Sequence, residues 1–162
     1  MSGFWRCACY IAATGIFSFF LGRILPKKWF MAEKFPYKEY RFEQGGKFYE
    51  RLQIHKWQNK VPDMSKIVPS LMPPKKLTGD YEEKLPRMIE ETCVAEFIHG
   101  LLCFSGLACI GLWQGIGGWV VSLINIALFN LPFVLIQRYN RPRLGKLMRK
   151  RKERRERVQC ES

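Results

Sequence analysis

Residues 93–113 read CVAEFIHGLLCFSGLACIGLW, residues 114–118 read QGIGG, and residues 119–137 read WVVSLINIALFNLPFVLIQ. Each apolar arm is about twenty residues long, which as an α-helix matches the roughly 30 Å hydrocarbon core of a bilayer. Both arms are apolar almost all round, so length rather than periodicity predicts two transmembrane helices. The glycine-rich turn is uncharged, and both arms therefore begin and end at the opposite membrane face, where the nearby charged groups gather.

A third apolar run, CACYIAATGIFSFFLG at residues 7–22, lies between Arg6 and Arg23. A cleaved signal peptide is one interpretation of it. A retained span is favoured, because no clear small-x-small cleavage site lies near Ile24 and the following PKKW resembles an interface anchor. The sequence thus predicts an all-α integral membrane protein with about three transmembrane helices in one domain, 1–162. The predicted parts are spans at about 5–25, 93–113 and 117–137, an amphipathic cytoplasmic insert at 26–92, and a basic cytoplasmic tail at 138–162.

The distribution of charge predicts the orientation of these spans. The formal net charge is +13, and residues 138–162 alone hold 11 Lys/Arg against 3 Asp/Glu. The segment between the first two spans is also rich in Lys and Arg, whereas the QGIGG turn has neither. The positive-inside rule therefore places the amino terminus outside and the carboxyl terminus in the cytoplasm of a multi-pass cell-membrane protein. Beside membrane spans, anionic lipid explains the basic tail better than nucleic acid does, so no nucleic-acid partner is expected.

Several chemistries lack their usual motifs. The six cysteines form no CxxC pair and no metal-like spacing with histidine, so neither a metal site nor a bound cofactor is expected. The chain also has no GxSxG elbow, Walker loop, HExxH or dinucleotide fingerprint.

The insert interleaves aromatic and basic residues, which is typical of a surface lying at a lipid interface. Residues 47–60 are expected to form one helix with an apolar side. The tail is expected to be helical near the membrane and frayed beyond it.

Two ionisable residues, Glu96 and His99, lie in the first turns of the second span. With Thr92 and Cys103 they are spaced i, i+4, i+7 and i+11, which places them on one helical face. Such residues are costly in a membrane and usually face a bundle interior or a wet cavity. We expect Glu96 to accept a hydrogen bond from one ring nitrogen of His99 and leave the other nitrogen as a general base. The alternative is a polar helix end that tail arginines neutralise at the interface.

Residues 137–144, QRYNRPRL, leave the third span at the same face. Arginine forks suit phosphate or carboxylate groups, although plain topology anchoring explains them nearly as well. Pro142 is expected to break the helix, so Arg141 and Arg143 need not point the same way.

Other polar residues are less informative. Asn125 and Asn130 on the third span suit interhelical hydrogen bonds as well as they suit a site. His55 is interpreted as an exposed surface residue beside Lys56.

Four features together resemble a known family. They are the first span and three segments: GKFYERLQIHKWQNKVP at 46–62, ETCVAEFIHG at 91–100 and NLPFVLIQRYNRPRL at 130–144. In this order they resemble the glycosyl-4,4′-diaponeurosporenoate acyltransferases, small membrane proteins of staphyloxanthin biosynthesis. The resemblance covers nearly the whole chain from Pro26 onward, and QRYNRPRL is its most specific part.

The resemblance implies transfer of a fatty acyl group to a glucose hydroxyl of a glycosylated C30 carotenoid acid at the membrane. A fatty acyl thioester such as acyl-CoA would be the donor. We expect His99 to deprotonate the hydroxyl, Glu96 to orient the imidazole, and Tyr139 or Asn140 to donate to the oxyanion. The predicted substrate- and donor-binding residues are Lys56, Trp57, Lys60, Glu91, Gln137, Arg138, Arg141 and Arg143.

Two other functions fit parts of the pattern. One is a small membrane transferase of another group, such as methyl, acting on a lipid acceptor. The other is a non-catalytic adaptor whose tail recruits acidic partners or lipids, which leaves the Glu96 and His99 pair unexplained. Since three spans form a thin bundle, a homo-oligomer such as a dimer would shelter the substrate.

Overall fold

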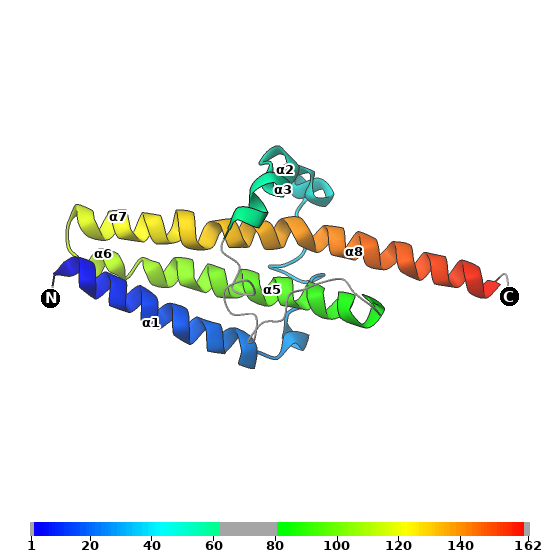
Figure 1. Ribbon diagram of the computed structural model, residues 1–162, viewed down its shortest axis with the longest axis horizontal. Helices are drawn as coiled ribbons and strands as arrows, with labels where there is room; N and C mark the ends of the chain where they lie inside the picture. The colour runs from blue at the N-terminus through cyan, green and yellow to red at the C-terminus, as the bar shows by residue number, and fades with distance from the viewer. Residues whose placement is uncertain (1, 62–80, 161–162) are drawn as a thin grey trace.

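Three helical runs form the body of the protein. The computed structural model describes residues 2–61 and 81–160, and every regular element in these ranges is helical. The runs Gly3–Ile24, Lys84–Leu112 and Ile116–Cys160 are each long and apolar enough to cross a membrane. They lie side by side, and the amino terminus is near the turn that joins the second and third runs (Figure 1). The predicted all-helical class and the three apolar runs are confirmed.

The elements of the bundle follow the sequence pattern closely. The first run is α1 (Gly3–Ile24), which packs mainly against α5. The second and third runs are each interrupted, and α5 packs along α8 more extensively than any other pair of elements in contact. Their bounds are α5 (Tyr81–Gly106), α6 (Cys109–Leu112), α7 (Ile116–Ile124), the π-helical segment η4 (Asn125–Asn130) and α8 (Leu131–Cys160).

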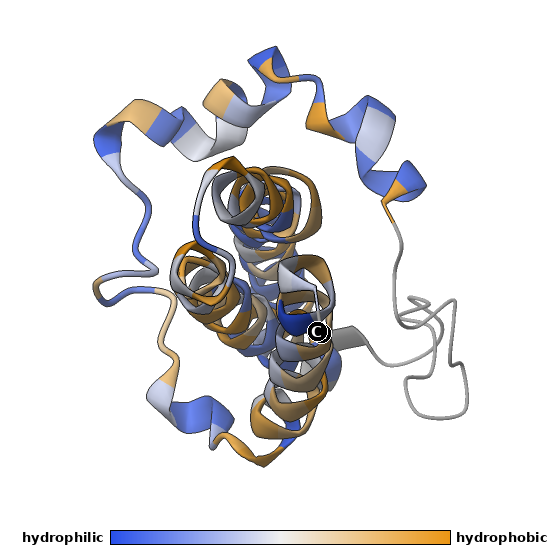
Figure 2. Ribbon diagram, turned by 90° about the vertical axis from the view of Figure 1, so that its left-hand side faces the viewer, coloured by the Kyte–Doolittle hydropathy of each residue, from blue (hydrophilic) through white to orange (hydrophobic). Residues whose placement is uncertain are grey.

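The apolar side chains of the bundle point mostly outward. In the most apolar 18-residue window of the first, second and third run, only 11, 33 and 17% of the window is buried, respectively. Phe17 of α1 and Phe104 of α5 are 64 and 75% exposed. Figure 2 shows that hydrophobic residues, in orange, make up much of the bundle helices. Exposed apolar surface of this extent is characteristic of a helix bundle surrounded by lipid rather than water.

The described part of the insert wraps around the bundle as an arc of short helices (Figure 2). Its elements η2, α2 and α3 contact α8, and η1 contacts α5. Residues 62–80 of the predicted insert lie outside the described residues. The elements are η1 (Lys27–Trp29), η2 (Arg41–Gly46), α2 (Lys47–Arg51), α3 (Ile54–Trp57) and η3 (Gln58–Lys60).

The prediction of one helix over residues 47–60 is wrong. The chain turns at Gln53, whose φ of 54° lies in the left-handed region and ends α2. The indole Nε1 of Trp57 donates to the carbonyl oxygen of Leu52 at 3.1 Å, which stabilises the turn. The short helices of this segment follow a curved path around α8. This path lets the apolar residues of each short helix pack against α8.

The predicted break at Pro142 is also wrong, because α8 continues through it to Cys160. Proline removes one backbone donor but does not prevent a helix whose neighbouring residues are held by tertiary contacts. Arg141, just before it, is buried against other elements, and Lys146, one turn after it, donates to the carbonyl oxygen of Gly45 at 3.0 Å. The same continuity corrects the expectation that the distal tail is frayed, since α8 is helical through the described tail (Figure 1).

A glycine at the closed end of the bundle tests this packing. A Cβ added at Gly118 of α7 would overlap the carbonyl oxygens of Cys109 and Trp113, which are backbone atoms and cannot rotate away. We expect Gly118→Ala to destabilise the protein by about 1–3 kcal/mol, as overpacking does. Gly111→Ala is the control, because a Cβ at Gly111 meets nothing within 4 Å. Thermal denaturation in detergent measures both, and equal stability of the two variants would contradict the α6–α7 packing.

Candidate functional site

Four charged side chains, three of them buried and Arg138 partly buried, lie together where α5, α8 and the insert meet. They are Glu43 of η2, Glu96 of α5, and Arg138 and Arg141 of α8, called the charged cluster below. Glu43, Glu96 and Arg141 are 3, 8 and 7% exposed. Because the cluster contains two carboxylates and two guanidinium groups, its formal charges balance.

Arg138 uses all three nitrogens of its guanidinium group. Its Nε donates to Glu96 Oε1 at 2.7 Å, and its Nη1 donates to Glu43 Oε1 at 2.9 Å. Its Nη2 donates to the carbonyl oxygen of Pro36 at 2.6 Å. The guanidinium carbon also lies 4.8 Å from the centre of the Tyr40 ring. Arg138 therefore joins α5, α8 and the insert in a single set of contacts.

Arg141 is the second link between the same elements. Its Nη2 donates to Glu96 Oε2, so the two arginines share both oxygens of one carboxylate. Its Nε donates to the Thr92 hydroxyl at 2.9 Å, and its Nη1 donates to the carbonyl oxygen of Tyr37 at 2.7 Å. Thr92 and Glu96 are one turn apart on α5, which faces them both toward α8.

Buried charges are costly unless they are paired and fully hydrogen-bonded. The cluster meets both conditions, so it is stable where a single ionised group would not be. Glu43 also accepts a hydrogen bond from the Tyr49 hydroxyl. Burial, followed by this bond to Glu43, raises the pKa of Tyr49 well above its ordinary value. The phenol is consequently a permanent donor to the cluster at physiological pH.

The predicted pairing of His99 with Glu96 is not what the structure has. Glu96 is bound by the two arginines, whereas His99 Nδ1 lies 3.0 Å from Asn130 Oδ1. The His99 ring also stacks on Phe133, with centroids 4.5 Å apart and an interplanar angle of 5°. Both residues face the bundle interior as predicted, but they take different partners there because α8 brings its arginines to Glu96.

The other predicted site residues on α8 lie in several different environments. Tyr139 is 2% exposed, packs with Tyr49 and Ile54, and accepts a hydrogen bond from Arg143. Asn140 Nδ2 donates to Gln58 Oε1 at 3.5 Å. Gln137 is half-buried on α8.

The predicted binding residues outside α8 divide in the same way. Glu91 pairs with Lys27 at 2.5 Å and with Arg87 at 3.4 Å, so it ties α5 to the start of the insert. Lys56 and Lys60 are exposed, and Trp57 between them is half-buried. The structure therefore gathers Glu96, Arg138 and Arg141 into one site, and leaves Lys56, Lys60 and Glu91 outside it.

Sequence analysis missed Glu43 and Tyr49. Charge balance offered a signal, since two buried arginines need two carboxylates and Glu96 is the one acidic residue within the apolar part of α5. The insert has several glutamates, however, and only its fold determines which of them reaches α8. The backbone carbonyls of Pro36 and Tyr37 have no sequence signal at all.

An apolar groove of about 290 Å³ begins at the charged cluster. Glu96 and Tyr37 form its polar end, and Pro36 adjoins them. Because Arg138 and Arg141 hold the carbonyl groups of Pro36 and Tyr37, the cluster also positions this end of the groove. The remaining walls are Phe97, Gly100, Leu101 and Phe104 of α5 and Val134 of α8.

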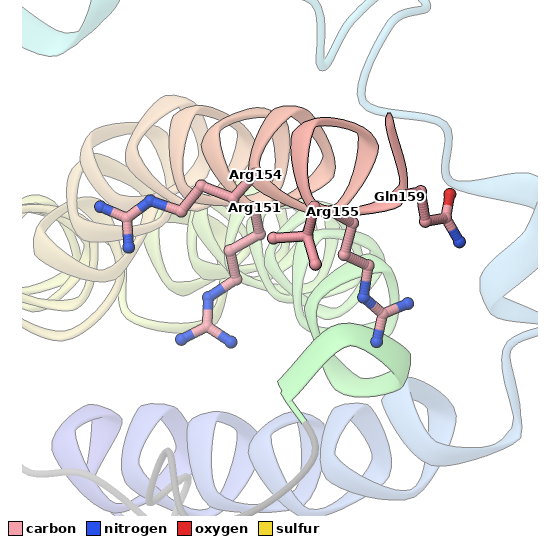
Figure 3. Close-up of a pocket in the computed structure, with 5 residues that line it drawn as sticks. Arg151, Arg154, Arg155 and Gln159 are labelled. Atoms are coloured by element: carbon pink, nitrogen blue, oxygen red, sulfur yellow. The ribbon is translucent and has the colours of Figure 1, made fainter. Parts of the chain in front are cut away.

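A second hollow, of about 460 Å³, lies near the carboxyl end of α8. Figure 3 shows Arg151, Arg154, Arg155 and Gln159 projecting from this one helix. Its lining in the described part of the chain is basic and comes from α8 alone, which is the character expected of a tail attracted to anionic lipid.

The charged cluster predicts a strong effect of losing one charge. Glu43→Gln leaves the buried arginines with a single carboxylate, so we expect a loss of about 3–5 kcal/mol of stability. Glu50→Gln is the matched control, because Glu50 lies on neighbouring α2 and is exposed. Denaturation of both purified proteins in detergent measures the difference. A Glu43→Gln protein as stable as the control would show that Glu43 is not part of a buried ion pair.

Comparisons with known proteins identify the family of the chain. The model of the glycosyl-4,4′-diaponeurosporenoate acyltransferase family matches residues 26–150, which include the charged cluster, His99 and the groove. A protein of that name from Staphylococcus aureus strain MRSA252 is 36% identical over 141 residues, covering 85% of this chain and 82% of its own. The protein from strain N315 is 34% identical with the same coverage. No solved structure gives a significant match. The chain belongs to the glycosyl-4,4′-diaponeurosporenoate acyltransferase family and is an acyltransferase.

Proposed function

We propose that this protein esterifies a sugar hydroxyl of a glycosylated carotenoid acid, or a closely related membrane glycolipid, with a fatty acyl group taken from a thioester donor such as acyl-CoA. The groove beside the charged cluster is the observation that carries the proposal. Its walls are apolar, its end at Glu96 is polar, and its position between α5 and α8 makes it accessible to a lipid-like chain. The names of the relatives support the acyl-transfer reaction and the carotenoid glycoside acceptor.

The acyl chain of the substrate is placed in the groove. Phe97, Leu101 and Phe104 repeat at helical spacing along α5 and offer a continuous apolar wall. Gly100 keeps this wall open, since nothing lies within 4 Å of the position its Cβ would take. The thioester end of the chain then lies near Glu96 and Tyr37, at the boundary between apolar and polar surroundings.

His99 is the proposed general base. It lies one helical turn from Glu96, which forms the polar end of the groove, and its ring stacks on Phe133. One ring nitrogen takes the proton of the sugar hydroxyl as the hydroxyl oxygen attacks the acyl carbonyl carbon. The carbon–sulfur bond then breaks, and the leaving thiolate receives the proton from the imidazolium.

The oxyanion of this step needs hydrogen-bond donors, for which Tyr139 and Asn140 stay our prediction. The Tyr139 hydroxyl accepts from Arg143, which leaves its own proton available for donation. Glu96 takes a different role from the one expected, because the two arginines occupy its oxygens. It holds the polar end of the groove together with Arg138 and Arg141.

We expect the carrier group of the acyl donor, such as coenzyme A, to bind the exposed cations at this end of the molecule. Arg138 and Arg141 are bound to carboxylates, so exposed Lys56, Lys60 and Arg143 are better placed to attract its phosphates. We further propose a multi-pass cell-membrane protein with this end in the cytoplasm, the amino terminus outside, and the basic tail on the inner leaflet. The three apolar helices support membrane insertion, and the Lys and Arg distribution supports this orientation.

Filling the groove should reduce acyl transfer. Gly100→Leu places a branched side chain in the groove, and we expect at least a tenfold loss of transfer from long-chain donors with a smaller loss for short-chain donors. Gly111→Leu is the control, because Gly111 also has free space around it but lies outside the groove. Mass spectrometry of the acylated glycolipid measures both. Equal losses of activity for all chain lengths, or for both variants, would show that the groove does not bind the acyl chain.

The proposed base is tested separately. His99→Ala should lower turnover by about 10²–10⁴-fold, the usual contribution of a general base. His55→Ala should keep normal turnover, because His55 is an exposed residue of the insert. A fully active His99→Ala enzyme would rule out the mechanism. Loss of a methyl group rather than an acyl ester from the membrane lipids, on deletion of the protein, would identify a different transferase.

A further inference from the structure

Two buried asparagines at the ends of η4 have no role in the acyl-transfer mechanism as described so far. Asn125 and Asn130 are 5 and 3% exposed in an otherwise apolar helix. A buried amide is costly unless its donors and acceptor are hydrogen-bonded. The hydrogen bonds that these amides make therefore indicate why two polar residues stand at buried positions.

The two amides form a chain that ends at His99. Asn125 Nδ2 donates to the backbone carbonyl oxygen of Leu102 at 3.2 Å. Asn130 Nδ2 donates to Asn125 Oδ1 at 3.2 Å and to the backbone oxygen of Asn125 at 2.9 Å. Asn130 Oδ1 lies 3.0 Å from His99 Nδ1. The chain thus runs from α5 to η4 and back to α5.

The direction of every bond in this chain follows from its first acceptor. A backbone carbonyl can only accept, so the Asn125 amide must present Nδ2 to Leu102 and Oδ1 to Asn130. The Asn130 amide must then present Nδ2 to Asn125, where the backbone carbonyl is a second obligatory acceptor. Only Asn130 Oδ1 is left to face His99, and an oxygen there requires a proton on Nδ1.

Two further contacts hold this arrangement in place. A Cβ on Gly106 would overlap Asn125 Nδ2, so glycine at this position makes room for the first amide. The parallel Phe133 ring limits rotation of the imidazole out of the plane that Asn130 requires.

We infer that Asn125 and Asn130 are positioning residues that fix neutral His99 in the Nδ1–H tautomer. The lone pair is then always on Nε2, the nitrogen that takes the proton of the acceptor hydroxyl. This role rests on the proposed function for the identity of the reaction. The tautomer itself depends only on the hydrogen-bond chain, so it can be measured without substrate.

Nitrogen-15 NMR of the detergent-solubilised full chain, labelled at histidine, measures the tautomer directly. The sequence has two histidines, so His55→Gln leaves His99 as the only signal. At about two pH units above the ordinary histidine pKa of ~6.5, we expect the signals of a protonated Nδ1 and a bare Nε2. Exposed neutral histidines favour the opposite tautomer, and the wild-type His55 signal provides that reference.

Variants break the chain at two places. Asn130→Leu and Asn125→Leu, each close in shape to asparagine, should shift His99 toward the Nε2–H tautomer. Ser122→Ala, a buried substitution one turn before Asn125, should leave the tautomer unchanged. If Asn130→Leu does not elute as a single species, Asn125→Leu tests the same chain. An Nε2–H signal in the wild-type background, or an unchanged tautomer in the folded leucine variants, would overturn the inference.

A kinetic measurement links the tautomer to the reaction. Asn130→Leu should lower kcat by at least tenfold with little change in KM, because it affects proton transfer and not substrate binding. A normal kcat in a variant with the altered tautomer would overturn the positioning role. If His99→Ala is fully active while the wild-type tautomer is Nδ1–H, the proposed base fails and the hydrogen-bond chain stands.

Discussion

The structure depends on the mutual neutralisation of Glu43, Glu96, Arg138 and Arg141 where α5, α8 and the insert meet. Each of the four charges would carry a large desolvation free energy if it were buried alone. Each therefore needs the others close by, and this fixes their positions. Glu96 is on α5, both arginines are on α8, and Glu43 is on the insert. The requirement for charge balance therefore joins three segments that are distant in the sequence, at the end of the bundle opposite the α6–α7 turn.

The groove and the histidine site follow from this junction. The same arginines bind the carbonyl groups of Pro36 and Tyr37, which places the insert over the polar end of the groove. The helix pair α5 and α8, held together by the cluster, also brings η4 beside His99. Charged, apolar and hydrogen-bonding parts consequently meet within a few turns of α5, on the rigid helices of the bundle.

The sequence predicted the long elements and the inward face of α5, because these depend on local length, polarity and helical spacing. The high cost of ionisable groups in an apolar helix predicted the inward orientation of Glu96 and His99. Partner choice could not be predicted, since Glu96 could reach either His99 or the arginines, and only the packing of α8 decides between them. Pro142 was misjudged for a related reason, because tertiary contacts on both sides of it outweigh the loss of one backbone hydrogen bond.

Photo-crosslinking with a fatty acyl thioester whose chain bears a diazirine most directly tests the claim that the charged cluster organises an acyl-binding groove. Peptide mass spectrometry then locates the adducts. The account predicts that they concentrate on Phe97 and Leu101 of α5 and on Val134 of α8, and that excess unlabelled donor removes them. Adducts on the outward-facing Phe17 and Phe20 of α1 at equal yield, unaffected by competitor, would contradict it.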